Sequence, residues 1–187
     1  MQNKEFKKQL KSLEINIDTL NEGFNLLTQL TDTQYTQGFR PAFQSTIGAH
    51  FRHILEHYRC FINQFSSGTF CYDERKRDEN LEQDRGYAVE TIESLLLDLK
   101  NFEMNSFSQK YQFMDQQIIE PVRTNLEREL LFLQSHSVHH YAIIAAMTRL
   151  IGEHPVAEFG VAFATRTFNE EQAYLKSKKD EEVVCAQ

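Results

Sequence analysis

The sequence predicts an all-α fold, a four-helix bundle with one long crossed connection. Apolar residues recur at helical spacing in four long segments, and convincing strand patterns are scarce. A polar link between the second and third segments is long enough to cross the bundle. The 187 residues suit a single domain with a substantial core, which we expect to span residues 4–165.

The first predicted helix runs from about Lys4 to Leu30, where leucine, isoleucine and phenylalanine recur every three or four positions. A polar stretch follows, from Thr31 to Gly38, and Pro41 suits the start of the second helix. Its apolar positions continue to Phe61, and we expect Gly68 to supply the C-terminal stop.

The link from Tyr72 to Arg85 is charged and predicts a loop or crossover. The third helix spans Ala88 to Phe102 by its apolar spacing. Tyr111 to Ile119 alternates apolar and polar residues and indicates an extended segment, at most a short hairpin.

The fourth helix begins at Thr124-Asn125-Leu126-Glu127, which has the form of a capping box. It continues to about Leu150, where Gly152 and Pro155 end it. Residues 156–163 are apolar enough to pack, whereas the polar segment 170–187 is expected to fray.

The composition excludes several classes of protein. The formal net charge is −7 and the Lys and Arg residues are not concentrated in one run, which argues against a nucleic-acid partner. The three cysteines, Cys60, Cys71 and Cys185, lack the spacing of a disulfide framework or a zinc ribbon, so we expect a reducing, cytoplasmic location. The longest apolar run, from Tyr141 to Met147, is too short to span a bilayer.

Six of the seven histidines fall in two groups, one in the second predicted helix and one in the fourth. The first group contains His50, His53 and His57, and the second is the stretch from His136 to His140. Residues four apart stack on one face of a helix, so His136 and His140 can direct two imidazoles at one metal ion. Two such groups on packed helices predict a metal site at the helix interface.

Helical periodicity places His136 and His140 about 40° apart on the apolar arc of the fourth helix. Glu129 lies two turns earlier on that face and is a candidate catalytic carboxylate, although a buried carboxylate bonded to a neighbouring Arg or Tyr is the simpler explanation. On the second helix, His50 and His57 sit at the middle of the arc and His53 at its edge.

A single histidine that faces the core is most simply explained as a hydrogen-bonded structural residue. Several buried imidazoles are harder to explain, because each one left unpaired costs on the order of 1 kcal/mol or more. Other metal and catalytic motifs are missing: no histidine follows a glutamate by three positions as in di-iron bundles, and HExxH, P-loop and GxSxG patterns do not occur.

The chain resembles the DinB/YfiT-like superfamily, which is associated with metal-dependent enzymes. The residues that carry the resemblance are the segment from Thr46 to Glu56, the stretch from His136 to His140, and Arg149 to Gly152. The loop Tyr72-Asp73-Glu74 is also similar to a family segment.

The resemblance implies a four-helix bundle with a crossed connection and one divalent metal ion, Zn or Ni, held by three histidines. In the family's register these ligands are His53, His136 and His140. Register and periodicity disagree about the upstream ligand, since periodicity favours His50. The family's usual Arg-Gly-Gln after the last ligand is replaced by Tyr141-Ala142-Ile143.

These observations lead to two functional hypotheses. The first is a divalent-metal-dependent enzyme, a thiol-dependent S-transferase or a hydrolase, acting through a metal-bound thiolate or water, with a low-molecular-weight thiol as co-substrate. In it, Glu129 or His50 orients a ligand imidazole or relays a proton. The second is a non-catalytic, stress-linked binding or scaffold protein with a structural or vestigial metal site. The expected partners are a small-molecule substrate and a second copy of the chain in a homodimer, without nucleic acid or membrane.

Overall fold

The computed structural model describes residues 2–102 and 110–185, and the side chains from Lys11 to Lys178 within those ranges. The predicted helical class is confirmed, since helices account for most of the described residues. The long helices are α1 (Gln2–Gln29), α3 (Ile47–Gln64), α5 (Arg85–Lys100), α6 (Leu126–Leu150) and α7 (Phe163–Cys185). Two short helices, α2 (Asp32–Thr36) and α4 (Asn80–Gln83), precede α3 and α5.

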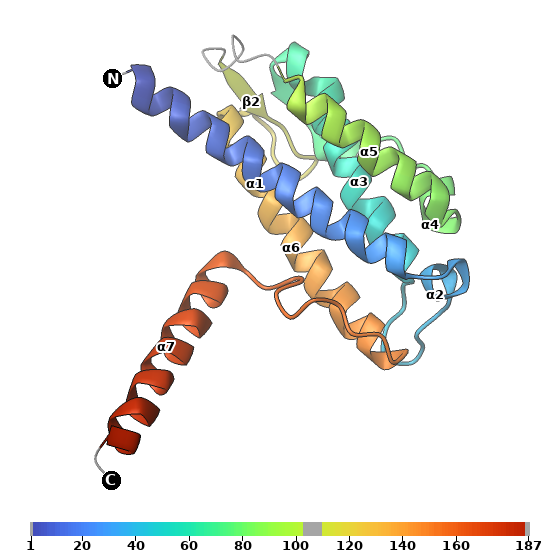
Figure 1. Cartoon of the computed structure of the whole chain (residues 1–187). Coiled ribbons are helices and arrows are strands. Elements are labelled where there is room, and N and C mark those ends of the chain that lie inside the picture. The colour runs from blue at the N-terminus through green and yellow to red at the C-terminus, as the bar shows by residue number, and fades with distance from the viewer. Residues whose placement is uncertain (1, 103–109, 186–187) are drawn as a thin grey trace.

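The first four long helices pack around one apolar core. α1 lies against both α5 and α6, and α3 lies against the same two helices, so each helix has two neighbours (Figure 1). α1 and α6 run in one direction, and α3 and α5 run in the opposite one (Figure 1). The centre of the core is filled by fully buried aromatic and aliphatic side chains, among them Leu20, Leu27, Phe51, Leu55 and Tyr141.

The link between α3 and α5 runs back along the bundle, as expected of a crossed connection. It begins with strand β1 (Thr69–Phe70) at one end and reaches α4 at the other end, beside α2. The Tyr35 hydroxyl donates to the carbonyl of Leu81, and Gly48 at the start of α3 packs on the carbonyl of Glu82. These contacts hold the link against the bundle, so that α5 starts where α3 also starts.

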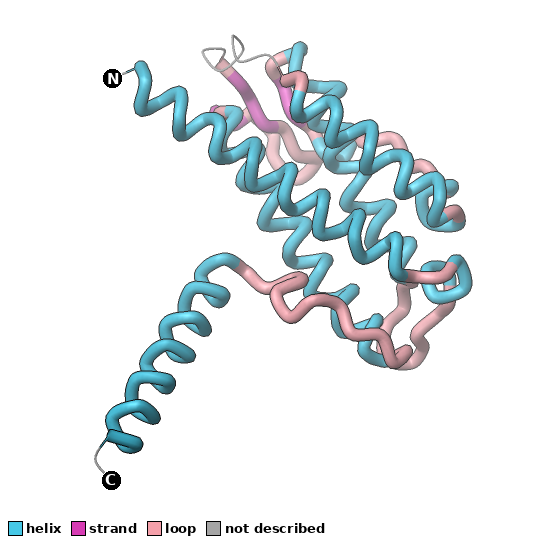
Figure 2. The backbone as a smooth tube through the Cα atoms, in the orientation of Figure 1, coloured by secondary structure: helices cyan, strands magenta, loops and turns pink. Residues whose placement is uncertain are grey.

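A small sheet closes the other end of the bundle (Figure 2). Its strand order is β1, β2 (Tyr111–Phe113), β3 (Val122–Thr124). β2 pairs with β3 in antiparallel register, Gln112 opposite Arg123, which agrees with the expected hairpin. β1 pairs with β2 in parallel, a contact between distant segments that periodicity did not indicate.

A buried polar network ties three of the long helices together. The Asn16 side chain on α1 donates to the carbonyl of Leu130 on α6 at 2.9 Å and accepts from the Tyr58 hydroxyl on α3 at 2.7 Å. Asn16 and Tyr58 are fully buried. Because an unpaired buried amide or hydroxyl is costly, this network favours one relative placement of α1, α3 and α6.

Two predicted helix starts are corrected by the structure. The second long helix begins at Ile47 and not at Pro41, because the Thr46 hydroxyl accepts from the backbone N–H of Ala49 and caps the first turn. α6 is capped by Asn125, whose side chain accepts from the N–H of Arg128, and not by Thr124.

The chain after α6 also differs from the prediction. Phe159 is buried and stacks on Tyr141 with ring centroids 4.6 Å apart, whereas Val156 and Phe163 are exposed, so residues 156–163 pack only in part. The polar segment expected to fray is instead helical as far as Cys185, in a helix that leaves the bundle (Figures 1 and 2). None of the described helices combines the length and the apolar character needed to cross a membrane.

We predict that Gly160→Ala destabilises the fold more than Gly152→Ala. Both glycines have positive φ, 73° and 80°, which costs an L-residue about 1–2 kcal/mol. A Cβ at Gly160 would also meet the backbone of Ala142, whereas a Cβ at Gly152 meets open space. Urea denaturation of both variants measures the difference. Equal losses in the free energy of unfolding would show that the close approach of residue 160 to α6 does not affect stability.

Candidate metal centre

Two histidine pairs face each other across the seam between α3 and α6. His53 and His57 are four residues apart on α3, and His136 and His140 are four residues apart on α6. The helical repeat places each pair on one face of its helix, one turn apart. The centroids of neighbouring rings within this group are 4.4–4.9 Å apart. The two sequence groups therefore form one cluster, as their spacing predicted.

Two Nε2 atoms lie close to the Nε2 of His136, near the centre of this cluster. The Nε2 of His136 lies 3.1 Å from the Nε2 of His53 and 3.1 Å from the Nε2 of His140. His136 therefore stands between the other two rings. These three residues are the ligand set that the family resemblance implied.

His50 extends the cluster on the side of His140. Its Nδ1 lies 2.9 Å from the Nδ1 of His140, and its Nε2 lies 2.8 Å from the Ser45 hydroxyl. His50 thus contacts the ring of His140 directly and is held in turn by Ser45. This is the position of a residue that orients a neighbouring imidazole.

His57 flanks the cluster on the opposite side. Its Nδ1 lies 2.7 Å from the backbone carbonyl of His53, so this nitrogen carries the proton and the other one is an acceptor. The ring of His57 stacks on Tyr72, with centroids 5.4 Å apart. Tyr72 also packs against Phe132, which stacks on His136. Sequence reasoning placed His57 on the inner arc but gave it no role, although its four-residue spacing from His53 repeats that of the other pair.

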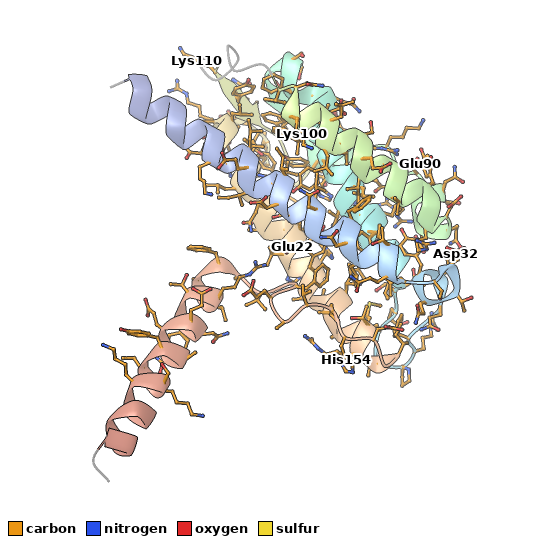
Figure 3. All side chains as sticks on the ribbon, viewed as in Figure 1. Glu22, Asp32, Glu90, Lys100, Lys110 and His154 are labelled. Atoms are coloured by element: carbon orange, nitrogen blue, oxygen red, sulfur yellow. The ribbon has the colours of Figure 1, made fainter. Side chains whose placement is uncertain are left out.

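Among the described residues, His53, His57 and His136 offer ring nitrogens that all lie within 4.8 Å of one another. This group shares two members with the predicted ligand set and replaces His140 by His57. The two remaining histidines lie outside the core of the cluster. His139 is exposed, and His154 follows the end of α6 (Figure 3).

Burial keeps the clustered imidazoles neutral at pH 7. It lowers the pKa of His53 to about 2, and the neighbouring His57, His140 and His136 add to the shift. Burial also lowers the pKa of His140 to about 3 and that of His57 to about 4. The pKa values of His50 and His136 are lowered for the same main reason. Neutral imidazoles are the form that binds metal ions.

The separations of the His53 and His140 Nε2 atoms from that of His136 are each compatible with two ligands of one divalent ion. Two nitrogens bound at 2.0–2.1 Å from one ion stand about 3.3 Å apart at a tetrahedral angle and about 2.9 Å apart at a right angle. The two separations of 3.1 Å lie between these values. Imidazole suits Zn, Ni, Cu and Fe, so the donor set agrees with the expected divalent ion without selecting one metal.

A family model of the DinB family matches residues 1–173. The chain belongs to the DinB family. Its fold is similar to the crystal structure of a DinB-like protein, YjoA, from Bacillus subtilis, with a TM-score of 0.56 and 16% sequence identity over 76% of this chain and 93% of that one. No curated protein matches the chain at a significant level.

In this member of the DinB family, Glu129 is fully buried at the edge of the cluster. Its carboxylate accepts from the Tyr72 hydroxyl at 3.1 Å, from Arg128 at 3.0 Å and from the Thr124 hydroxyl. Glu129 therefore reaches the histidines through Tyr72, which stacks on His57. Its contacts are those of the simpler alternative, a buried carboxylate bonded to a neighbouring Arg and Tyr.

A charged cavity of about 350 Å³ lies between α3, the link that follows it and α5. Arg75 lines it and is also close enough to the histidines for its charge to lower the pKa values of His53, His57 and His136. The Arg75 Nε is buried and has no hydrogen-bond partner among the described residues. This cavity has the volume of a small-molecule site.

The cysteines show no sign of activation. Cys60 and Cys71 are buried, and burial raises the pKa of the Cys60 thiol to about 11. The Cys60 thiol donates to the carbonyl of Cys71 at 3.5 Å. Both observations describe unreactive thiols. The side chain of Cys185 lies outside the described residues.

We predict that Glu129→Ala costs about 3 kcal/mol of the free energy of unfolding, because it leaves the Tyr72 and Thr124 hydroxyls without their buried acceptor. Urea denaturation measures this loss, with Glu120→Ala, at an exposed loop position, as the control. A Glu129→Ala protein as stable as the control would mean that the carboxylate is not a structural acceptor.

Proposed function

We propose that this protein is a divalent-metal-dependent enzyme that transfers a group from a small-molecule substrate to a thiol or to water. The observation that carries the proposal is the close approach of the His53 and His140 Nε2 atoms to the Nε2 of His136 at the α3–α6 seam. Three neutral imidazoles leave a divalent ion with open positions, which is typical of catalytic and not of structural zinc sites.

His53, His136 and His140 would hold the ion. The contacts of His140 support its place in this set, because its Nδ1 is engaged by His50 while its Nε2 faces His136. Ligand histidines in proteins usually have their second nitrogen fixed in this way. His50 is then a positioning residue, and Ser45 holds its outer nitrogen.

When bound, the ion supplies positive charge that lowers the pKa of a thiol or water beside it. His57 is placed to accept the proton that such a group releases. The hydrogen bond of its Nδ1 to the His53 carbonyl leaves the other nitrogen as an acceptor, and the ring lies 4.4 Å from those of His53 and His136. Tyr72 stacks on His57 and fixes the plane of its ring.

Two features support a small molecule as the substrate. The net charge of −7 without a basic run disfavours nucleic acid. The cavity that Arg75 lines, near the histidine cluster, has the volume of a small-molecule site. A low-molecular-weight thiol meets both conditions and remains the proposed co-substrate.

The ligand assignment predicts about one divalent ion per chain in protein purified without a His-tag and loaded with Zn or Ni. His53→Ala, His136→Ala and His140→Ala each lose stoichiometric metal, because two imidazoles hold an ion far more weakly than three. His57→Ala retains it. Elemental analysis gives the metal content of each variant.

His154→Ala is the control, since it removes a histidine outside the cluster. Loss of metal in His57→Ala together with full occupancy in His140→Ala would replace the proposed set by His53, His57 and His136. Full occupancy in all four cluster variants would place the metal elsewhere.

Catalysis is tested by a screen of thiol conjugation and of ester and amide hydrolysis. We expect chelation to abolish the turnover found and metal to restore it. His57→Gln should lower kcat by about 10²–10⁴-fold, the usual contribution of a general base, while the metal content stays at one ion per chain.

A variant with Cys60, Cys71 and Cys185 changed to Ser should retain turnover. Turnover that survives chelation and disappears in this variant would contradict the metal-dependent mechanism. Bound metal without turnover in any of these reactions would favour the non-catalytic binding protein.

A further inference from the structure

The charged cavity between α3, the link that follows it and α5 contains none of the clustered histidines. Its volume, about 350 Å³, is at the lower end of the range for small-molecule sites. Its charged lining consists of three cationic and three anionic side chains: Arg59, Arg75, Lys76, Glu56, Glu74 and Asp78. Because these formal charges cancel, electrostatic complementarity favours a ligand that carries both signs of charge over a simple anion.

One ion pair in the wall of the cavity is already satisfied within the protein. Arg59 donates to the Asp78 carboxylate at 2.9 Å, to the Tyr87 hydroxyl at 3.1 Å and to the Thr91 hydroxyl at 3.0 Å. The Tyr87 hydroxyl in turn donates to Asp78 at 3.0 Å. The charges of Arg59 and Asp78 therefore neutralise each other and hold the link against α5.

Arg75 is bonded less completely. Its Nη1 donates to the Tyr72 carbonyl at 2.9 Å, but its Nε is 3.6 Å from the Glu56 carboxylate, longer than a hydrogen bond. Glu56 has other partners, since it accepts from the backbone N–H of Asp78 at 2.8 Å and lies 3.7 Å from the Arg52 Nε. A guanidinium carries five donor hydrogens, so Arg75 can offer further donors to a carboxylate in the cavity.

Two opposite charges flank Arg75 in the link. Glu74 and Lys76 both line the cavity and are exposed, and neither side chain forms a hydrogen bond or an ion pair with another described residue. Residues two apart have Cα atoms within about 7 Å of each other, so the two charges belong to one short stretch of wall. An α-amino acid matches this stretch, because a single carbon separates its ammonium from its carboxylate.

We propose that this cavity binds a free α-amino acid, with its carboxylate at Arg75 and Lys76 and its ammonium at Glu74. A second polar hollow, of about 210 Å³, adjoins the cavity, because Arg59 and Asn63 line both. A polar side chain of the amino acid has room to extend into it. The proposal does not rest on the metal-dependent reaction, so the two can fail separately.

The first test is calorimetric titration of the full chain in the presence of EDTA, which prevents an amino acid from binding through a metal ion. The probes are L-serine, ethanolamine, which lacks the carboxylate, and 3-hydroxypropanoate, which lacks the ammonium. We expect L-serine to bind about tenfold more tightly than either analogue, because each analogue loses hydrogen bonds between charged groups. Absence of L-serine binding overturns the proposal, and so does equal binding of 3-hydroxypropanoate, which would indicate a simple anion site.

The second test locates the bound amino acid. Glu74→Gln and Lys76→Met, both at exposed positions, should each raise the Kd for L-serine by about tenfold. The matched controls are Glu93→Gln and Lys110→Met, which remove one charge of each sign at exposed positions outside the cavity. Circular dichroism checks that each variant is folded. An unchanged Kd in Glu74→Gln and Lys76→Met would place the amino acid elsewhere, and an equal rise in the controls would mean that only net charge matters. Either result overturns the proposal.

Discussion

The site depends on the register between α3 and α6, because each helix contributes one half of it. The buried network of Asn16, Tyr58 and the Leu130 carbonyl sets that register. Tyr58 follows His57 directly, and Leu130 precedes His136 by less than two turns. A shift of α3 along α6 would break buried hydrogen bonds and separate the facing imidazoles at the same time. Stability and the chemistry of the site are therefore specified by the same few contacts.

The helices could be predicted where their own sequence decides them. Apolar spacing located α1, α3, α5 and α6, because each buries one stripe against the same core. The start of α3 was placed at Pro41 because proline suits a first turn, but the hydroxyl of Thr46 caps the helix later. The parallel pairing of β1 with β2 joins residues more than forty positions apart, and the start of α7 is held by the contact of Arg166 with Glu22 on the distant α1. Local patterns carry no information on either.

The sequence predicted which faces of the two histidine-bearing helices meet, but not the contacts of each side chain. Four-residue spacing identified the His136 and His140 pair, and the structure adds the pair of His53 and His57 opposite it. The sequence anticipated an Arg or Tyr as the partner of Glu129 but could not identify Tyr72, which comes from the distant link between α3 and α5. A helical wheel predicts the direction in which a side chain points, but it does not identify the residue that the side chain contacts. The same limit left His50 and His53 as rival ligands, and the structure places both in one cluster.

The arrangement of protons suggests a role for His50 beside His140. His136 Nε2 can accept from both neighbouring rings, with His140 protonated at Nε2 and accepting from His50 at Nδ1. If His140 held an ion through Nε2, as proposed, its proton would move to Nδ1. His50 must then accept that proton's hydrogen bond and donate from its own Nε2 to Ser45. A neutral imidazole and a hydroxyl both donate and accept, so this chain can reverse without leaving a buried nitrogen unpaired. Each polar atom of an amide or a cationic side chain at position 50 could only donate or only accept a hydrogen bond. A histidine can do either at each ring nitrogen, so it suits both directions of this hydrogen-bond chain.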